Sequence, residues 1–152
     1  DSNWSPDVEL SSAKGLELYK QQGGEYGDQI DSVVGFTPTL VEEILKIHGS
    51  VKVNGQEFNS QNFTEKLEYE VEYGFKDKGI EFKDRKNMLS ELAGVMIKSL
   101  ALDVVTHSGT YLKLAEKMVA EKHLLVYSPQ LDWQAEAAKK NLTGGMQDFN
   151  GD

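Results

Sequence analysis

The chain has 152 residues, of which 39% are apolar, and 16 basic against 25 acidic residues give a formal net charge of −9. This apolar share and the 3 prolines exclude intrinsic disorder as the main state and allow a core. Arg85 is the only arginine, so general nucleic-acid binding is not expected. The sequence has no apolar run near the roughly 18 residues of a membrane-spanning helix. It also has no cysteine, so disulfides, thiolate zinc sites and thiol catalysis are excluded.

The first part of the chain predicts a helix followed by a strand. The helix begins around Ser5-Pro6-Asp7, where a cap, a first-turn proline and an acidic residue coincide, and runs to Gln22. Gly23-Gly24 ends it. Residues 29–36 are apolar on both faces over a short length, which is typical of a buried strand.

A second helix and a β-hairpin are predicted next. Thr37-Pro38 begins a helix that ends at Gly49. Its apolar face consists of Leu40, Val41, Ile44, Leu45 and His48. Asn54-Gly55 is the favoured pair for a two-residue turn with positive φ at both positions, so residues 51–58 are predicted to form the hairpin.

Residues 60–73 allow two predictions. Apolar and polar residues alternate strictly from Lys66 to Phe75, which is a strand pattern. Asn59 or Ser60 is a good helix cap, and the glutamates and lysines that follow favour a helix. We predict a helix over residues 60–73, partly from a resemblance described below.

Three further helices and a strand complete the prediction. An amphipathic helix begins at Asp84, and its apolar face consists of Met88, Leu89, Leu92, Val95, Met96 and Leu100. His107-Ser108-Gly109 breaks the chain before another helix, a short buried strand over residues 124–127, and a last helix that reaches Lys140. We therefore predict an α/β or α+β fold, a small central sheet of short strands layered with about six helices, in a single domain of residues 1–152.

No recognised catalytic motif is present. His48, His107 and His123 are far apart in the sequence and none has ligand spacing with another, so packing or capping roles are favoured over metal binding. Glu68 and Glu72 would share one helix face, where paired carboxylates either bind a metal ion or, more commonly, stay solvated.

The first seven residues are one candidate site. Asp1, Asn3, Trp4 and Asp7 gather two carboxylates, an amide and an indole before the start of a helix. Helix amino ends bind anions, and Asp1 and Asp7 would supply ligands for a cation that bridges to one. The other interpretation is an ordinary capped helix with Trp4 packed against it.

Arg85 is the second candidate, in the first turn of the amphipathic helix. An arginine at this position can bind phosphate oxygens beside the free N–H groups of the helix. The alternative is a salt bridge with Asp84 or Glu81.

Four segments together resemble one bacterial family, known as domain of unknown function 4012. These segments are residues 1–7, 30–36, 49–55 and 122–127. The resemblance implies an extracytoplasmic domain of a cell-envelope protein that is anchored by an amino-terminal membrane helix. It also implies that this chain is a segment of that larger protein.

The middle of the chain is distantly similar to the LytR–CpsA–Psr family of extracytoplasmic phosphotransferases. The similarity covers residues 13–53 and the arginine-containing start of a helix at residues 84–89. Members of that family move glycopolymers from a polyprenyl pyrophosphate lipid to the cell wall. The resemblance implies that Arg85 contacts pyrophosphate and that residues 60–73 are helical.

Two hypotheses about function follow. In the first, the domain is a non-catalytic envelope module that binds a wall glycopolymer, a lipid-linked precursor or a protein partner, with no evident cofactor. In the second, it is a phosphotransferase-like domain that uses Mg²⁺ held partly by Asp1 or Asp7, while Arg85 neutralises phosphate charge.

Overall fold

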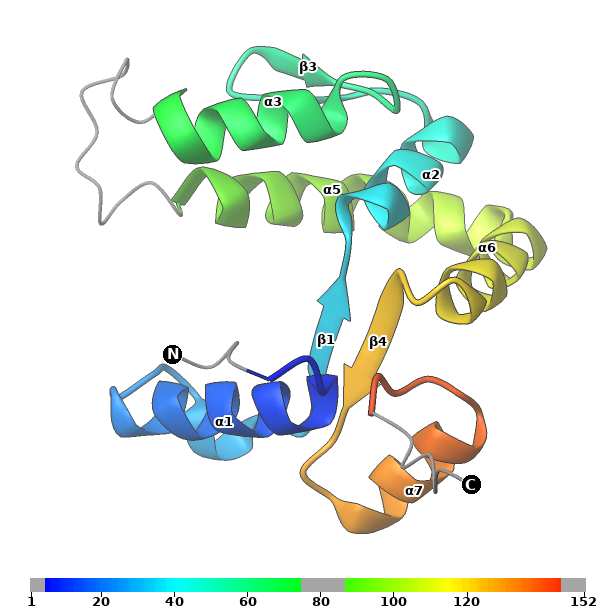
Figure 1. Cartoon of the computed structure of the whole chain (residues 1–152). Coiled ribbons are helices and arrows are strands. Elements are labelled where there is room, and N and C mark those ends of the chain that lie inside the picture. The colour runs from blue at the N-terminus through cyan, green and yellow to red at the C-terminus, as the bar shows by residue number, and fades with distance from the viewer. Residues whose placement is uncertain (1–4, 75–86, 146–152) are drawn as a thin grey trace. The chain divides into compact units, whose positions relative to one another are not determined.

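The computed structural model describes residues 5–74 and 87–145 (Figure 1). The chain divides into two compact units, which we call the terminal unit (residues 1–36 and 117–152) and the central unit (residues 37–116). The described part contains six α-helices and two antiparallel two-stranded sheets. The predicted mixed fold of short strands and about six helices is confirmed. None of the helices in this part of the chain has the length and apolar character needed to cross a membrane.

The terminal unit is built around a sheet of two strands that are distant in the sequence. Its elements are α1 (Val8–Gln21), the 3₁₀ turn η1 (Gly27–Gln29), β1 (Val33–Phe36), β4 (Leu124–Tyr127) and α7 (Leu131–Lys139). β1 and β4 run antiparallel, with Val33 opposite Tyr127 and Phe36 opposite Leu124. Helices α1 and α7 both contact β4. A further helix, α6 (Ser108–Ala120), begins in the central unit and ends in this one.

Helix α1 is capped at its amino end by Asp7, two residues after Ser5, the residue that the sequence predicts as the cap. The Asp7 carboxylate accepts a hydrogen bond from the N–H of Leu10 at 3.0 Å, and the Ser5 hydroxyl oxygen accepts one from the N–H of Asp7 at 3.1 Å. At the other end, Gly23 adopts a φ of 71°, which a glycine adopts without strain. The predicted helix is confirmed to within two residues at its start.

Strand β1 is less buried than the sequence indicates. The side chains of Val34 and Phe36 are 54% and 61% exposed, and the strand begins only at Val33. The prediction of a buried strand over residues 29–36 is therefore wrong about its burial. The physical reason is that β1 has one neighbour, β4, and within the described residues no further strand extends the sheet.

The segment of residues 141–145 joins β4, α1 and the turn before β4 in the terminal unit. Leu142 accepts a hydrogen bond from the N–H of Val126 in β4 at 2.9 Å, and Gly144 accepts one from the N–H of Val8 in α1 at 3.2 Å. Lys122 Nζ donates to Asn141 Oδ1 at 2.7 Å and to the Thr143 carbonyl at 3.2 Å. Residues 141–145 therefore hold α1 against β4.

We expect Gly144→Ala to destabilise the protein by about 1–3 kcal/mol. A Cβ atom at this position would lie 2.6 Å from Val8 Cγ2 and 2.9 Å from Leu125 Cδ1, and the short valine side chain has little room to move. The matched control is Gly94→Ala in a helix of the central unit, where a Cβ meets nothing within 4 Å. That control should stabilise by about 0.5–1 kcal/mol, because alanine favours a helix interior. Chemical denaturation of both variants measures the contrast, and equal losses would contradict it.

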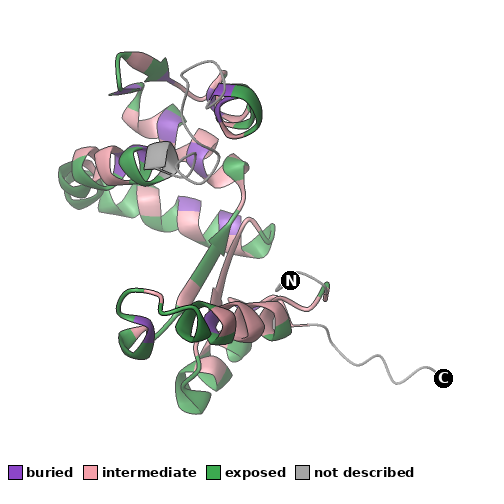
Figure 2. Ribbon diagram, turned by 90° about the vertical axis from the view of Figure 1, so that its left-hand side faces the viewer, coloured by how far each residue is buried: buried purple, intermediate pink, exposed green. Residues whose placement is uncertain are grey.

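The central unit packs a hairpin and three helices around one core. Its elements are α2 (Pro38–His48), β2 (Val51–Val53), β3 (Gln56–Phe58), α3 (Phe63–Tyr69), the π-helical turn η2 (Glu70–Gly74) and α5 (Asn87–Thr106). The buried core residues are Val41, Leu45, Val51, Val53, Phe58, Phe63, Leu92 and Met96. Figure 2 colours the buried residues of the described chain purple. The predicted turn is confirmed, with φ values of 51° at Asn54 and 79° at Gly55.

The helical prediction for residues 60–73 is also confirmed. Residues 63–69 are α-helical and residues 70–74 continue as a π-helical turn. Phe63 is buried at the start of the helix, whereas Tyr69 and Tyr73 are about half exposed. The alternation of tyrosine and glutamate in this segment therefore does not mark a strand with one buried face.

Candidate functional site

A groove of about 510 Å³ lies in the terminal unit, between α1 and the chain that leads into β1. One face of α1 supplies most of it, because the lining positions recur every three or four residues along the helix. The lining residues are Ser5, Val8, Ser11, Ser12, Gly15, Leu16, Tyr19, Ile30 and Val33. This groove is the candidate binding site.

None of the described residues that line the groove has a charged side chain. Leu16 is buried in its floor, and Val8, Ile30 and Val33 add further apolar surface. Two of the three lining serines have locally fixed hydroxyls. That of Ser11 donates to the Ser5 carbonyl at 2.8 Å, and that of Ser5 accepts from the N–H of Asp7 at 3.1 Å. An apolar floor with a few fixed polar groups is the usual composition of a site for an organic ligand.

Tyr19 forms one end of the groove and is held in place by the turn that ends α1. Its hydroxyl donates to the Glu25 carbonyl at 3.1 Å, and the ring remains 44% exposed. Gly24 packs against the ring so closely that a Cβ there would lie 2.3 Å from Tyr19 Cε1. The Gly23-Gly24 pair therefore ends the helix and also positions an aromatic side chain.

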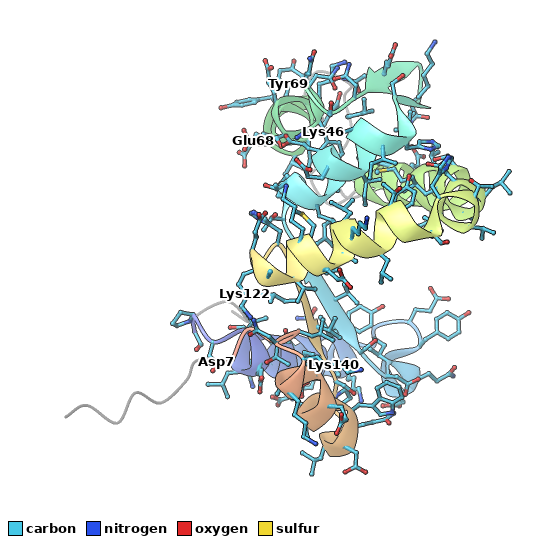
Figure 3. All side chains as sticks on the ribbon, turned by 90° about the vertical axis from the view of Figure 1, so that its right-hand side faces the viewer. Asp7, Lys46, Glu68, Tyr69, Lys122 and Lys140 are labelled. Atoms are coloured by element: carbon cyan, nitrogen blue, oxygen red, sulfur yellow. The ribbon has the colours of Figure 1, made fainter. Side chains whose placement is uncertain are left out.

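A second, polar hollow of about 590 Å³ lies at the amino end of α1. Asp7, Glu9 and Lys122 line it together with the backbone of residues 143–145. Figure 3 labels Asp7 at the start of the helix and Lys122 nearby in the same unit. Because the Lys122 ammonium already donates to Asn141 and Thr143, we interpret this hollow as part of the contact that holds the unit together.

Three polar side chains of the central unit contact the carboxylate of Asp103. The Asp103 carboxylate contacts His48 Nδ1 at 3.1 Å and His107 Nδ1 at 2.8 Å, and it accepts a hydrogen bond from the Tyr111 hydroxyl. These residues come from the end of α2, the end of α5, the residue between α5 and α6, and the first turn of α6. We call them the Asp103 network.

The Asp103 network shifts the acidity of two of its members. The Tyr111 hydrogen bond lowers the pKa of the Asp103 carboxyl, and the histidine contacts lower it further against the effect of burial. Burial, and then the bond to Asp103, raise the pKa of Tyr111 to about 12. Both shifts favour an ionised Asp103 beside a neutral tyrosine.

Residues 1–71 match the model of a family described as Protein of unknown function (DUF4012). The sequence resembles the DUF4012 family, and this match supports the resemblance. No curated protein and no solved structure matches the chain. The resemblance to the LytR–CpsA–Psr family is not shown by these comparisons.

The predicted site residues fall mostly outside the described part of the chain. Asp1, Asn3, Trp4 and Arg85 all lie outside it. Asp7 is described, and its carboxylate caps α1. Among the described residues, no group of three or more histidine, aspartate or glutamate side chains is arranged to hold a metal ion.

Sequence reasoning missed the Asp103 network because its members are separated along the chain. His48 and Asp103 are 55 residues apart, and nothing in either local pattern indicates that they meet. His107 stands at the predicted break between helices, and its spacing of four residues from Asp103 was the available signal. Glu68 and Glu72 are both exposed, as the solvated interpretation of that pair expects.

Proposed function

We propose that this domain is an extracytoplasmic binding module of a bacterial cell-envelope protein. Its site is the groove along α1, and its ligand is an uncharged stretch of a wall glycan. The observation that supports this proposal is the lining of the groove, whose described residues are apolar side chains, a glycine, three serines and one exposed tyrosine, with no charged group among them.

The lining matches the chemistry of a sugar chain. A pyranose ring presents an apolar C–H face, which packs against an aromatic ring or an aliphatic floor, and hydroxyl groups at its edges. Tyr19 offers an aromatic face together with a polar tip. Ser12 and the other serines of the groove have hydroxyl groups, which can both donate and accept hydrogen bonds.

The charge of the protein favours an uncharged ligand. The chain carries a formal charge of −9, and the described residues that line the groove include neither lysine nor arginine. A polyanionic wall polymer or a pyrophosphate group would meet no compensating cation among these described residues. A neutral glycan has no such electrostatic cost.

The alternative function, a Mg²⁺-dependent phosphotransferase acting on polyprenyl-pyrophosphate-linked glycopolymers, gains no support from the contacts described. Its arginine, Arg85, lies outside the described residues, and the Asp7 carboxylate makes a helix-capping hydrogen bond. The binding module is therefore the function that we put to experiment.

The test compares Tyr19→Ala with the parent chain in binding to chitotetraose, a neutral oligosaccharide of N-acetylglucosamine, by isothermal titration calorimetry. Loss of the ring should weaken binding about tenfold, because an aromatic contact of this kind contributes about 1–1.5 kcal/mol. Tyr19→Phe keeps the ring and should bind nearly as well as the parent. Co-sedimentation with purified peptidoglycan sacculi should give the same order of affinities.

Tyr26→Ala is the matched control. Tyr26 belongs to the turn that follows α1 and is 66% exposed, but it does not line the groove. Its replacement should leave binding unchanged. Equal binding by the Tyr19→Ala and parent chains would show that the groove is not the site, and a parent that binds neither probe would overturn the proposed function.

A further inference from the structure

The two groups of α1 best suited to contact a ligand in the groove are two helical turns apart. Ser12 and Tyr19 both line the groove and are separated by seven residues. Seven residues make almost two full turns, so both side chains lie on one face, about 10.5 Å apart along the helix axis. The turn between them contributes Gly15 and Leu16 to the lining, and neither has a polar side-chain atom.

The hydroxyl of Ser12 is available to a ligand. Serine hydroxyls inside a helix commonly donate to the carbonyl four residues earlier. Within the part of the chain that the structure describes, the Ser12 hydroxyl has no hydrogen-bond partner, whereas the hydroxyls of Ser5 and Ser11 each have one. Serine is also a poorer helix former than alanine, so this hydroxyl adds no stability to α1.

Tyr19 presents an aromatic face at a fixed position. Its hydroxyl donates to the Glu25 carbonyl at 3.1 Å, and the ring stays 44% exposed. This face can stack on the apolar face of one sugar ring. The groove therefore offers one stacking contact and one hydrogen bond, two helical turns apart.

We propose that the groove binds a β-1,4-linked glycan as an extended chain along α1, with one sugar residue per helical turn. This inference rests on the function proposed above. One residue of such a chain advances by nearly the rise of one turn of an α-helix. Successive residues alternate in orientation, so the same edge returns at every second residue. A sugar stacked on Tyr19 therefore brings the second sugar beyond it to Ser12 in the same orientation.

The spacing selects both the linkage and the minimum length of the ligand. A helix of 14 residues is nearly straight, whereas an α-1,4-linked chain curls and leaves such a surface after a few residues. The middle sugar of an extended chain turns its other edge to Gly15 and Leu16, which offer no side-chain hydrogen bond. A trisaccharide is the shortest ligand that reaches Tyr19 and Ser12 together.

Isothermal titration calorimetry of the 152-residue chain with chitobiose and chitotriose tests the spacing. The parent should bind chitotriose about fivefold more tightly, because only the trisaccharide gains the hydrogen bond to Ser12. Ser12→Ala should remove this gain and leave the affinity for chitobiose unchanged. Tyr19→Ala should weaken the binding of both sugars.

Ser32→Ala is the matched control for Ser12→Ala. Ser32 belongs to the same unit, is exposed, and is not among the residues that line the groove. Its replacement should leave both affinities unchanged. Thermal unfolding of Ser12→Ala should show no loss of stability, so that a weaker affinity reports a lost contact with the sugar.

Cellotetraose and maltotetraose, two glucose tetramers that differ only in linkage, test the shape of the ligand. In competition with bound chitotetraose, the α-1,4-linked maltotetraose should be weaker than cellotetraose by about tenfold or more. Equal competition by the two tetramers, or none by either, would overturn the binding of an extended β-1,4-linked chain.

The outcomes distinguish this inference from the proposed function. If the parent binds chitobiose and chitotriose equally well while Tyr19→Ala loses affinity, the groove remains the glycan site and the two-turn spacing is wrong. If Ser12→Ala keeps full affinity for chitotriose, or loses affinity for chitobiose as well, the role of Ser12 is wrong. A parent that binds none of these oligosaccharides would overturn the proposed function and this inference together.

Discussion

Phe58→Ala should lower the free energy of unfolding by about 3–5 kcal/mol. Phe58 is 1% exposed at the end of β3, and its ring lies edge-on to that of Phe63, with 6.2 Å between the ring centroids. Removing it leaves a cavity among the hairpin, α2 and α3 that the helices cannot close without distortion. Denaturant unfolding of the whole chain measures the loss, and amide exchange in β2 and β3 assigns it to the central unit.

The matched control for Phe58→Ala is Leu102→Ala. Leu102 also belongs to the central unit, but it is 73% exposed, so its truncation should change stability by no more than about 0.5 kcal/mol. Similar losses for the two variants would show that Phe58 does not occupy the core position described.

Asp103→Asn should be less stable than the parent at neutral pH, and this difference should shrink in acid. The pKa of Asp103 is lowered in the folded protein, so its ionised form contributes stability above its ordinary value of 3.8. That contribution is lost as the pH falls below 3.8 and through the lowered folded value. Thermal unfolding at pH 7 and at several points below pH 4 measures both effects.

A titration of Tyr111 at alkaline pH tests the same network. Its pKa is raised from 10 to about 12 in the fold, so the stability that it contributes is complete below pH 10 and is lost as the pH rises through about 12. Absorbance of the tyrosinate at 295 nm should show one tyrosine that ionises late in the parent and earlier in Asp103→Asn. Glu68→Gln, which removes an exposed carboxylate far along the chain, is the control, and an identical shift in that variant would count against the Asp103 network.

Local signals in the sequence predicted most of the elements. The Asn54-Gly55 turn, the proline at the start of α2 and the Gly23-Gly24 end of α1 each act within a few residues, so their patterns are readable without tertiary structure. The burial of β1 was not predictable in this way. An apolar strand is buried only when other segments cover it. The sequence of a strand does not show how many other strands will lie beside it.

The candidate site, too, was predictable from the sequence only where it depends on a local pattern. The helix face that carries Ser11, Leu16 and Tyr19 follows from the period of α1, yet the groove also needs Ile30 and Val33, which the turn after the helix brings back alongside it. The Asp103 network required contacts over 55 residues, far beyond any local pattern. Asp7 was correctly placed at the start of a helix, and its capping hydrogen bond is the role that the structure describes.

The pairing of β1 with β4 also constrains the order in which the protein assembles. The Ser128 hydroxyl and the Asp31 carbonyl, which hydrogen-bond at 3.0 Å beside this sheet, are 97 residues apart in the chain. The β2–β3 hairpin closes over a two-residue turn, so the central unit has a nucleus that forms early during synthesis. The terminal unit must wait until residues 124–127 leave the ribosome, so α1 and β1 remain without their partner strand while the residues between β1 and β4 are synthesised.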